Sequence, residues 1–161
     1  MMSFSATVTS ELQQLLGRYI GSEYTNIKIA AQSIVVDRID HAFIRIQGRH
    51  KEEMLEKYLE AHKDQKILIF TQMKHVASTV ARNLHDQGYK VAALHGDIDQ
   101  RVRNITIKDI KADKVKILVA TDVASRGLNL NDIQLVINYD VPQDPESYVH
   151  RIGRTARAGQ S

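Results

Sequence analysis

Residues 67–70, Ile-Leu-Ile-Phe, form a continuous apolar run near the middle of the 161-residue chain. A strand with one wet face alternates apolar and polar residues, whereas a strand buried on both faces is apolar throughout. The run therefore predicts a buried strand of a parallel sheet that is covered on both sides. A helix is expected directly after it, from Lys74 to Gln87. Its inner face would carry Val76, Val80 and Leu84, which recur at helical spacing.

This strand-and-helix unit repeats along the chain. Short apolar segments predict further strands at 39–47, 91–94, 117–120 and 133–139. Amphipathic segments predict helices at 51–62, 99–112 and 145–157, and a polar loop is expected after residue 120. Alternating strands and helices indicate an α/β fold, a three-layer sandwich in which a mainly parallel sheet is flanked by helices.

Composition limits the classes of function. Hydrophobic residues make up 43% of the chain and charged residues 25%, as in ordinary globular domains. There is no cysteine, which excludes disulfides and thiolate metal sites, and the 7 histidines lack the spacing of paired metal ligands. No signal peptide or long apolar run is present, so we expect an intracellular, cytoplasmic protein without a membrane partner. The net charge of +3 is too small to indicate a nucleic-acid partner by itself.

Polar residues follow strand after strand. The carboxyl ends of parallel strands lie along one edge, where open α/β sheets bind ligands. The segments expected at that edge are Thr71 to Lys74, His95 to Asp97 with Gln100 and Arg103 one turn on, Thr121 to Asn129, and Asp140. Their hydroxyls, amides and guanidiniums suit the phosphates of a polyanion. Each segment also has a simpler explanation, because Asp97 or Asp99 could cap a helix and Gly127 could serve a turn.

A basic stretch, His150 to Gly159, closes the series. If the last helix continues through Arg157, the i, i+4 and i+7 spacing puts His150, Arg154 and Arg157 on one face. Arg151 would then point about 100° away. Paired guanidiniums offer a fixed fork of donors that suits charge developing on a phosphoryl group in transfer. A solvated basic face is the alternative explanation.

Several of these segments together resemble the motifs of the DEAD-box ATP-dependent RNA helicases. Ala120 to Leu128 is similar to motif V, and His150 to Gly159 is similar to motif VI. The remaining matches are Ile67 to Lys74 with motif IV, Ser5-Ala6-Thr7 with motif III, and His95-Gly96-Asp97 with the family segment that follows the second strand. The resemblance covers nearly the whole chain and implies the C-terminal RecA-like lobe of such a helicase.

The resemblance also implies roles for single residues. Catalysis at the γ-phosphate of ATP is implied for Arg154 and Arg157, and Gly127 and Asn129 would lie near the nucleotide with them. Contacts to the RNA sugar-phosphate backbone are implied for Lys74, Gly96, Gln100, Arg103 and Thr121. Coupling to the other lobe is implied for Ser5, Thr7, Asp122, Arg126, His150 and Arg151.

Two positions depart from the family pattern. Asn129 stands where the family usually has Asp, so the side chain keeps its hydrogen bonds but loses the charge. Met73 stands where the family usually has Thr, whose hydroxyl would meet an RNA phosphate. We expect Met73 itself to pack in the interior, with the charge of Lys74 beside it available to the phosphate.

The resemblance divides the chain into three parts. Residues 1–32 are expected to be the tail of a first RecA-like lobe, with motif III, a helix and a strand. Residues 33–37 would be the interlobe linker, and 38–161 the second lobe without its last strand and helix. Neither a P-loop sequence nor Asp-Glu-Ala-Asp occurs.

We therefore expect the chain alone to be inactive as an ATP hydrolase. ATP and Mg²⁺ would be cofactors of the two-lobe enzyme, with Mg²⁺ held by the other lobe, and RNA and that first lobe would be the partners. Two alternatives stay open: a freestanding, non-catalytic RNA-binding module, and the lobe of a DNA-directed helicase.

Overall fold

A computed structural model describes residue 42, residues 50–125, residues 128 and 130, and residues 132–154. The chain divides into two units, Met1–Ser33 and Ile34–Ser161, and every described residue belongs to the second. The features expected in 1–32, the linker at 33–37 and nearly all of the strand expected at 39–47 therefore lie outside the described residues.

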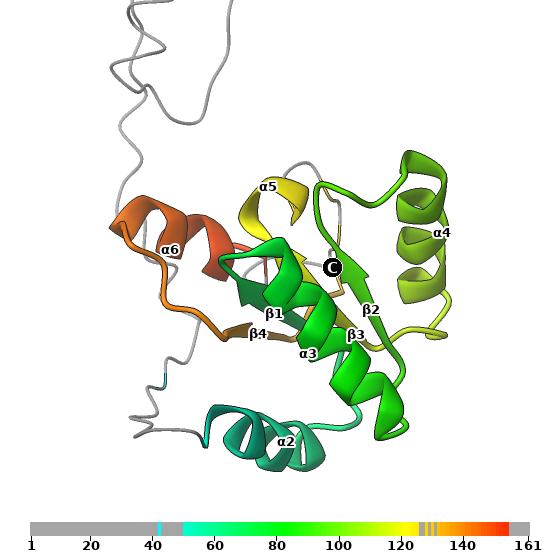
Figure 1. The fold of residues 1–161 in the computed structure, drawn as a ribbon, viewed down its shortest axis with the longest axis horizontal. Coiled ribbons are helices and arrows are strands. Elements are labelled where there is room, and N and C mark those ends of the chain that lie inside the picture. Colours follow the sequence, from blue (N-terminus) through cyan, green and yellow to red (C-terminus); the bar gives the residue numbers. More distant parts are fainter. Residues whose placement is uncertain (1–41, 43–49, 126–127, 129, 131, 155–161) are drawn as a thin grey trace, which may run out of the picture. The chain divides into compact units, whose positions relative to one another are not determined.

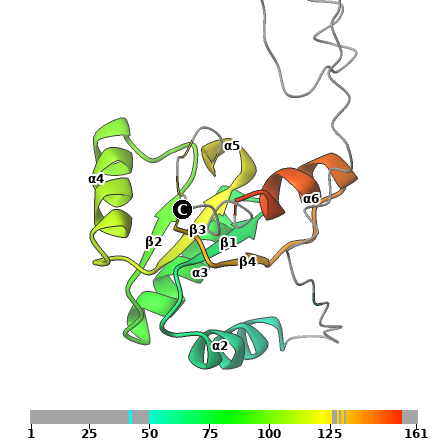
Figure 2. The ribbon, with the colours of Figure 1, turned by 180° about the vertical axis from the view of Figure 1, so that it is seen from behind.

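A parallel sheet forms the centre of the described unit (Figures 1 and 2). Its 4 strands lie in the order β2-β3-β1-β4. They are β1 (Ile67–Thr71), β2 (Val91–Leu94), β3 (Ile117–Thr121) and β4 (Leu135–Asn138). Ile67 lies opposite Ile117 on one side and opposite Leu135 on the other. Every residue of β1 is buried and both of its neighbours are parallel, so the buried parallel strand predicted from the apolar run is confirmed.

The described helices are α2 (Lys51–Ala61), α3 (Lys74–Asp86), α4 (Gln100–Lys111), α5 (Asp122–Ser125) and α6 (Pro145–Ile152). None of them combines the length and apolarity needed to cross a membrane.

The sequence at the end of α3 explains why this helix stops at Asp86. Gly88 has φ +90°, and its N–H and that of Tyr89 donate to the carbonyls of His85 and Leu84, at 2.9 and 3.0 Å. Glycine adopts this left-handed conformation without a steric penalty and so ends the helix.

Two expectations about the helices are wrong in detail. The loop expected after β3 begins instead with the single turn α5. The last helix ends at Ile152 rather than continuing through Arg154 towards Arg157. Gly153 directly follows, and glycine costs about 1 kcal/mol relative to alanine inside a helix. Arg157 itself lies outside the described residues.

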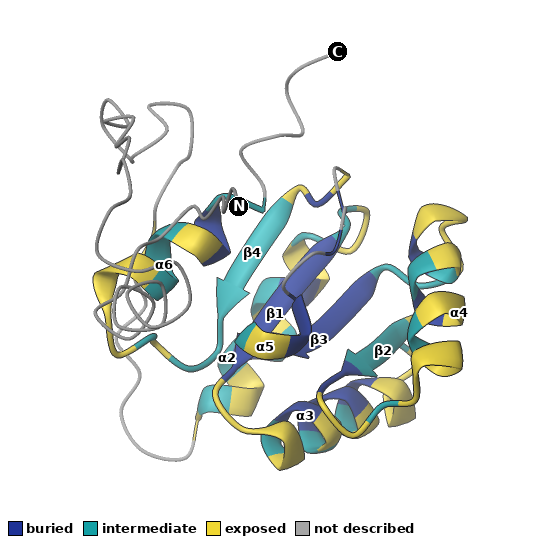
Figure 3. Cartoon of the chain, turned by 90° about the horizontal axis from the view of Figure 1, so that it is seen from above, coloured by how far each residue is buried: buried dark blue, intermediate teal, exposed yellow. Residues whose placement is uncertain are grey.

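The sheet separates two apolar cores. Figure 3 shows β1 and β3 as buried strands within the sheet. Ile67 and Ile69 of β1 pack with side chains of α2 and α3, whereas Leu68 and Phe70 pack on the other face with α4. This alternation follows from the two-residue period of a strand. Each fully buried Leu, Ile or Phe side chain contributes about 1.5–3 kcal/mol. The predicted sandwich of helices around a parallel sheet is confirmed, and it holds the carboxyl ends of the strands along one edge.

Candidate functional site

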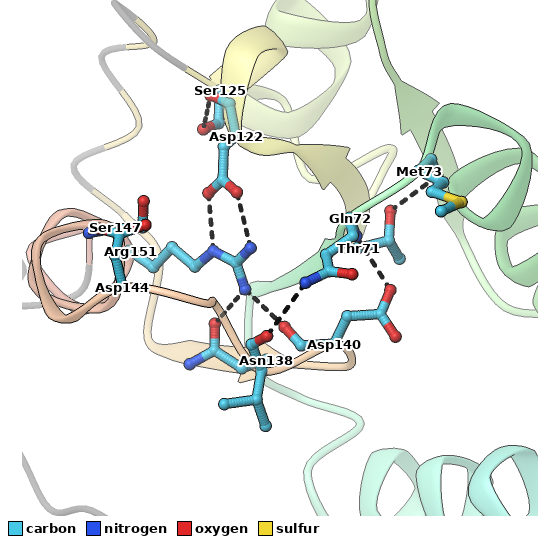
Figure 4. Close-up of polar contacts among 11 residues, drawn as sticks. Thr71, Gln72, Met73, Asp122, Ser125, Asn138, Asp140, Asp144, Ser147 and Arg151 are labelled. Carbon is cyan, nitrogen blue, oxygen red and sulfur yellow. Dashed lines mark hydrogen bonds and ion pairs between the residues drawn. The ribbon is translucent and has the colours of Figure 1, made fainter.

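The carboxyl edge of the sheet carries a connected set of polar side chains (Figure 4). Thr71 and Thr121 end β1 and β3 and are buried. Asn138 ends β4 and is half-buried, as is Asp140 two residues later. The prediction that polar residues after successive strands meet at one edge is confirmed for these elements.

Arg151 on α6 is the centre of this set, with 1% of its side chain exposed. Its Nε and Nη2 donate to the two carboxylate oxygens of Asp122, at 2.7 and 2.6 Å. Its Nη1 donates to Asn138 Oδ1 at 3.0 Å and to the Asp140 carbonyl at 2.7 Å. The guanidinium carbon lies 4.9 Å from the centroid of the Phe70 ring. A guanidinium can be buried only when it is paired and hydrogen-bonded, and here those bonds join the ends of β3 and β4 to α6.

These bonds give Arg151 and Asp122 a role inside the unit that the sequence did not reveal. Sequence spacing separated Arg151 from the face expected for His150, and the structure has His150 exposed and Arg151 buried. Coupling of Arg151, Asp122 and His150 to another lobe stays a prediction. For Arg151 it would act through the Asp122 pair, because the guanidinium is not at the surface.

Asp140 is a second centre, and neither of its partners was foreseen. Its Oδ1 accepts from Lys51 Nζ at 2.6 Å, and its Oδ2 accepts from the backbone N–H of Gln72 at 2.9 Å. Lys51 Nζ also lies 3.9 Å from the centroid of the Tyr139 ring. Burial raises the pKa of the Tyr139 hydroxyl, which stays protonated at neutral pH. A carboxylate directly after a strand was the only sequence signal for this centre.

The residues expected to contact a polyanion lie along the same edge. Lys74, the first residue of α3, forms an ion pair with Asp97 at 2.8 Å. The hydrogen bond from Lys74 holds the pKa of the Asp97 carboxyl below its usual value. Gly96 is exposed, and a Cβ built on it would meet no atom within 4 Å. The turn after β2 is therefore open to solvent and joined to the start of α3 by opposite charges.

His95, at the start of that turn, is held against α3. Its side chain is buried, and its Nε2 lies 2.8 Å from Ser78 Oγ on α3. Its Nδ1 is buried and has no hydrogen-bond partner among the described residues.

Helix α4 presents Gln100 and Arg103. Gln100 Nε2 donates to Asn104 Oδ1 at 3.0 Å, and Arg103 Nη2 donates to the Ala124 carbonyl of α5. Asp99 is the N-cap, because its carboxylate accepts from the N–H of Arg101 at 2.7 Å. The simpler explanation is therefore confirmed for Asp99, whereas Arg103 is held beside the end of β3.

Arg154 lies just beyond α6 and is half-buried. Its N–H donates to the Arg151 carbonyl at 3.2 Å, and its Nη1 donates to the Leu128 carbonyl at 3.3 Å. The basic stretch thus contacts the segment after β3. The other expected site residues lie outside the described residues, namely Ser5, Thr7, Arg126, Gly127, Asn129 and Arg157.

Met73 departs from expectation. We expected it to pack in the interior, but 55% of it is exposed. It is the N-cap of α3 with an extended backbone, φ −116° and ψ 140°, and it makes no side-chain capping bond. A residue at a helix start on the ligand edge projects away from both cores, which explains its exposure.

No metal site is assembled in the part that the structure describes. Groups of three or more His, Cys, Asp or Glu suited to hold a metal ion do not occur among these residues. Three carboxylates along the edge are engaged by cations, Asp122 by Arg151, Asp140 by Lys51 and Asp97 by Lys74.

A family model and curated proteins match this chain. A family model described as "Helicase conserved C-terminal domain" matches residues 50–159. The DEAD-box ATP-dependent RNA helicase CshA of Bacillus subtilis is 37% identical over 158 residues, which are 98% of this chain and 32% of that protein. The ATP-dependent RNA helicase CshA of Listeria monocytogenes is 37% identical over 157 residues, 98% of this chain and 30% of that protein. The chain spans about a third of the length of these curated relatives.

Solved structures are also similar to this chain in fold. S. cerevisiae Dbp5 bound to RNA and ADP BeF3 has a TM-score of 0.80 and 28% identity, covering 98% of this chain and 42% of that chain. A DEAD box protein from Methanococcus jannaschii has a TM-score of 0.71 and 39% identity, with the same coverage of 98% and 42%.

Proposed function

Because this chain belongs to the family of helicase conserved C-terminal domains, we propose that it acts as the second RecA-like lobe of a DEAD-box ATP-dependent RNA helicase. The resemblance to DEAD-box proteins drawn from motifs V and VI is confirmed by the curated relatives and structural neighbours. In the two-lobe enzyme this lobe would contact the RNA backbone and present arginines to ATP.

The buried pairing of Arg151 with Asp122 carries the proposal. It fixes Arg151, near the start of the basic stretch, against the end of β3, at the edge where open α/β sheets bind ligands. Arg154 follows within one turn and reaches the carbonyl of Leu128, the residue between Gly127 and Asn129. A guanidinium held there would stabilise negative charge on a phosphoryl group in transfer. Arg157 would act with it.

RNA would lie along the ends of the strands. Lys74 lies at the start of α3 and Gly96 in the turn after β2, and Arg103 and the buried Thr121 continue the row at the end of β3. Contacts of this kind go to phosphate and sugar, so binding would be independent of sequence and weakened by salt. Gln100 would add an amide donor on α4.

ATP with Mg²⁺ would be bound between this lobe and the first. Bound Mg²⁺ would neutralise phosphate charge, and its carboxylate ligands would come from the first lobe, because this sequence carries neither the P-loop nor the Asp-Glu-Ala-Asp motif. The chain alone would accordingly not hydrolyse ATP. Arg154 would orient the phosphates of ATP and neutralise their charge, and it would not hold the metal.

Binding of a fluorescent single-stranded RNA 12-mer to the chain, followed by anisotropy at several KCl concentrations, tests the proposal. Affinity should fall linearly on a log–log plot, and Arg103→Ala should reduce the slope by about 0.7, the contribution of one phosphate contact to single-stranded nucleic acid. Arg101→Ala is the matched control, because Arg101 is an exposed neighbour on the same helix and carries the same charge. It should leave the slope within about 0.2 of the wild-type value.

Three results would contradict the proposal. Equal slopes for the two variants would remove Arg103 from the interface. Equal competition by DNA of the same sequence would favour a DNA-directed lobe, because only RNA carries the 2′-hydroxyl. Robust ATP turnover by the chain alone would contradict the division of labour between two lobes.

A further inference from the structure

Asp140 connects two segments of the carboxyl edge that serve different ligands in the proposed function. One is the turn after β1, residues 72–74, where Lys74 would meet an RNA phosphate. The other is the arginine stretch, residues 151–154, which would meet ATP. These segments are distant in sequence, yet Asp140 bonds to both, from opposite ends of the same residue (Figure 4).

The first connection continues the pairing of β1 and β4 beyond the last ladder pair. The backbone N–H of Asp140 donates to the Phe70 carbonyl at 3.2 Å. The N–H of Gln72 then donates to Asp140 Oδ2 at 2.9 Å, so a side chain takes the place of the next backbone acceptor. Gln72 Nε2 also donates to the Val141 carbonyl at 3.4 Å. The turn after β1 and the segment after β4 are therefore held together.

The second connection runs through the backbone of the same residue. The Asp140 carbonyl accepts from Arg151 Nη1 at 2.7 Å, and the Arg151 carbonyl accepts from the N–H of Arg154 at 3.2 Å. Because the Arg151 side chain is 1% exposed, no water can replace a lost partner without opening the site. A shift of Asp140 must therefore move Arg151 or leave a buried N–H unpaired.

Lys51 keeps the carboxylate in this orientation. Its ammonium lies 2.6 Å from Asp140 Oδ1, and 22% of the Asp140 side chain is exposed, so the pair is partly shielded from solvent. With one oxygen bonded to Lys51 and the other to Gln72, the carboxylate cannot rotate without breaking a bond. A neutral residue here would lose this constraint on χ1 and χ2.

We propose that Asp140 is a positioning residue that couples RNA binding at the 72–74 turn to the placement of the 151–154 arginine stretch. The proposal rests on the proposed function, which supplies the two ligands. An RNA phosphate drawn to Lys74 and the amides of the turn displaces Gln72, and Asp140 passes that displacement to Arg151. A continuous chain of hydrogen bonds can carry such coupling, and one runs from Gln72 through Asp140 and Arg151 to Arg154.

Two-dimensional NMR of the 161-residue chain, titrated to saturation with an oligouridylate 12-mer, tests the coupling. Backbone amides of residues 72–74 report direct contact, and the Nε–H of Arg151 and the amide of Arg154 report the remote response. In the wild-type chain both sets should shift. In Asp140→Ala the 72–74 signals should still shift, whereas the shifts at Arg151 and Arg154 should fall at least threefold. Asp140→Asn should lose part of the remote shift, because its single amide oxygen replaces only one of the two carboxylate oxygens that accept from Lys51 and Gln72.

Comparison at saturation separates positioning from mere loss of stability or affinity. Asp132→Ala is the matched control, because it removes an identical charge from a side chain that is 61% exposed and lies 3.6 Å from Lys66, before β1. It should leave the remote shifts within about a tenth of the wild-type values, since distant sites act independently. If Asp140→Ala lacks a dispersed spectrum, Lys51→Met replaces it, and the remote shifts should fall at least twofold.

The outcomes separate the coupling through Asp140 from the RNA site on which it rests. Full remote shifts in Asp140→Ala, or in Lys51→Met where that variant is used, would overturn the coupling and leave RNA binding at the edge intact. A wild-type chain whose 72–74 signals stay fixed while RNA binds elsewhere would overturn the RNA site of the proposed function, and the coupling with it.

Discussion

Replacing Arg151 by Met removes the cation that Asp122 faces and takes away the donor of four partly buried acceptor atoms, both carboxylate oxygens of Asp122, Asn138 Oδ1 and the Asp140 carbonyl. The variant keeps most of the side-chain volume, so the cost comes from polar groups rather than a cavity. Removing one partner of a buried ion pair costs about 3–5 kcal/mol. Because 35% of the Asp122 side chain is exposed, water can partly solvate the remaining carboxylate, and we expect the lower end, about 3 kcal/mol.

Urea unfolding followed by circular dichroism measures this cost. With a slope of about 2 kcal/mol per molar urea, the midpoint should fall by about 1.5 M. Asp122→Ala alone should also be costly, since it leaves a buried guanidinium. The double variant should be at least about 2 kcal/mol more stable than the sum of the two single effects predicts, because it leaves neither charge unpaired. Arg82→Met, at an exposed position on α3, should change stability by less than about 0.5 kcal/mol.

Two results would refute this reasoning. A cost below about 1 kcal/mol for Arg151→Met would mean that the pair is no better than a surface ion pair. Additivity of the two single variants within about 0.5 kcal/mol would mean that the two groups do not interact.

Three further predictions concern a helix cap, a core residue and a surface ion pair. Asp144→Ala removes the N-cap of α6, whose carboxylate accepts from Ser147 N–H at 2.7 Å, and should cost about 1 kcal/mol in urea unfolding. Leu59→Ala, at a position with 0% exposure, should cost about 2–5 kcal/mol in the same assay, and a cost near zero would place Leu59 outside the core. The Asp97 carboxyl, followed by carbon NMR, should titrate below its usual value of 3.8, so its contribution to stability is present above that pH and lost as pH falls through the lower folded pKa. Lys74→Met should bring the Asp97 pKa back up, and an unchanged value would exclude the ion pair.

Local patterns predicted most of the fold. The apolar run at 67–70 predicted β1 as a buried strand, and the repeated units placed β2, β3 and the helices α3 and α4 within a residue or two of their observed bounds. Residue spacing carries this information because a strand repeats every two residues and a helix every 3.6 residues. The end of α6 was misplaced, since glycine after Ile152 outweighed the helical spacing of the arginines.

What the sequence determined by itself was the sandwich, the edge at which polar residues gather, and the family that the motifs resemble. The tertiary structure decided which side chains meet there. Arg151 pairs with Asp122 across 29 residues, and Asp140 pairs with Lys51 across 89. Both pairings depend on the strand order β2-β3-β1-β4, which puts β4 beside β1 although β2 and β3 lie between them in the chain. No local periodicity encodes that order, because it arises from the packing of whole elements around two cores.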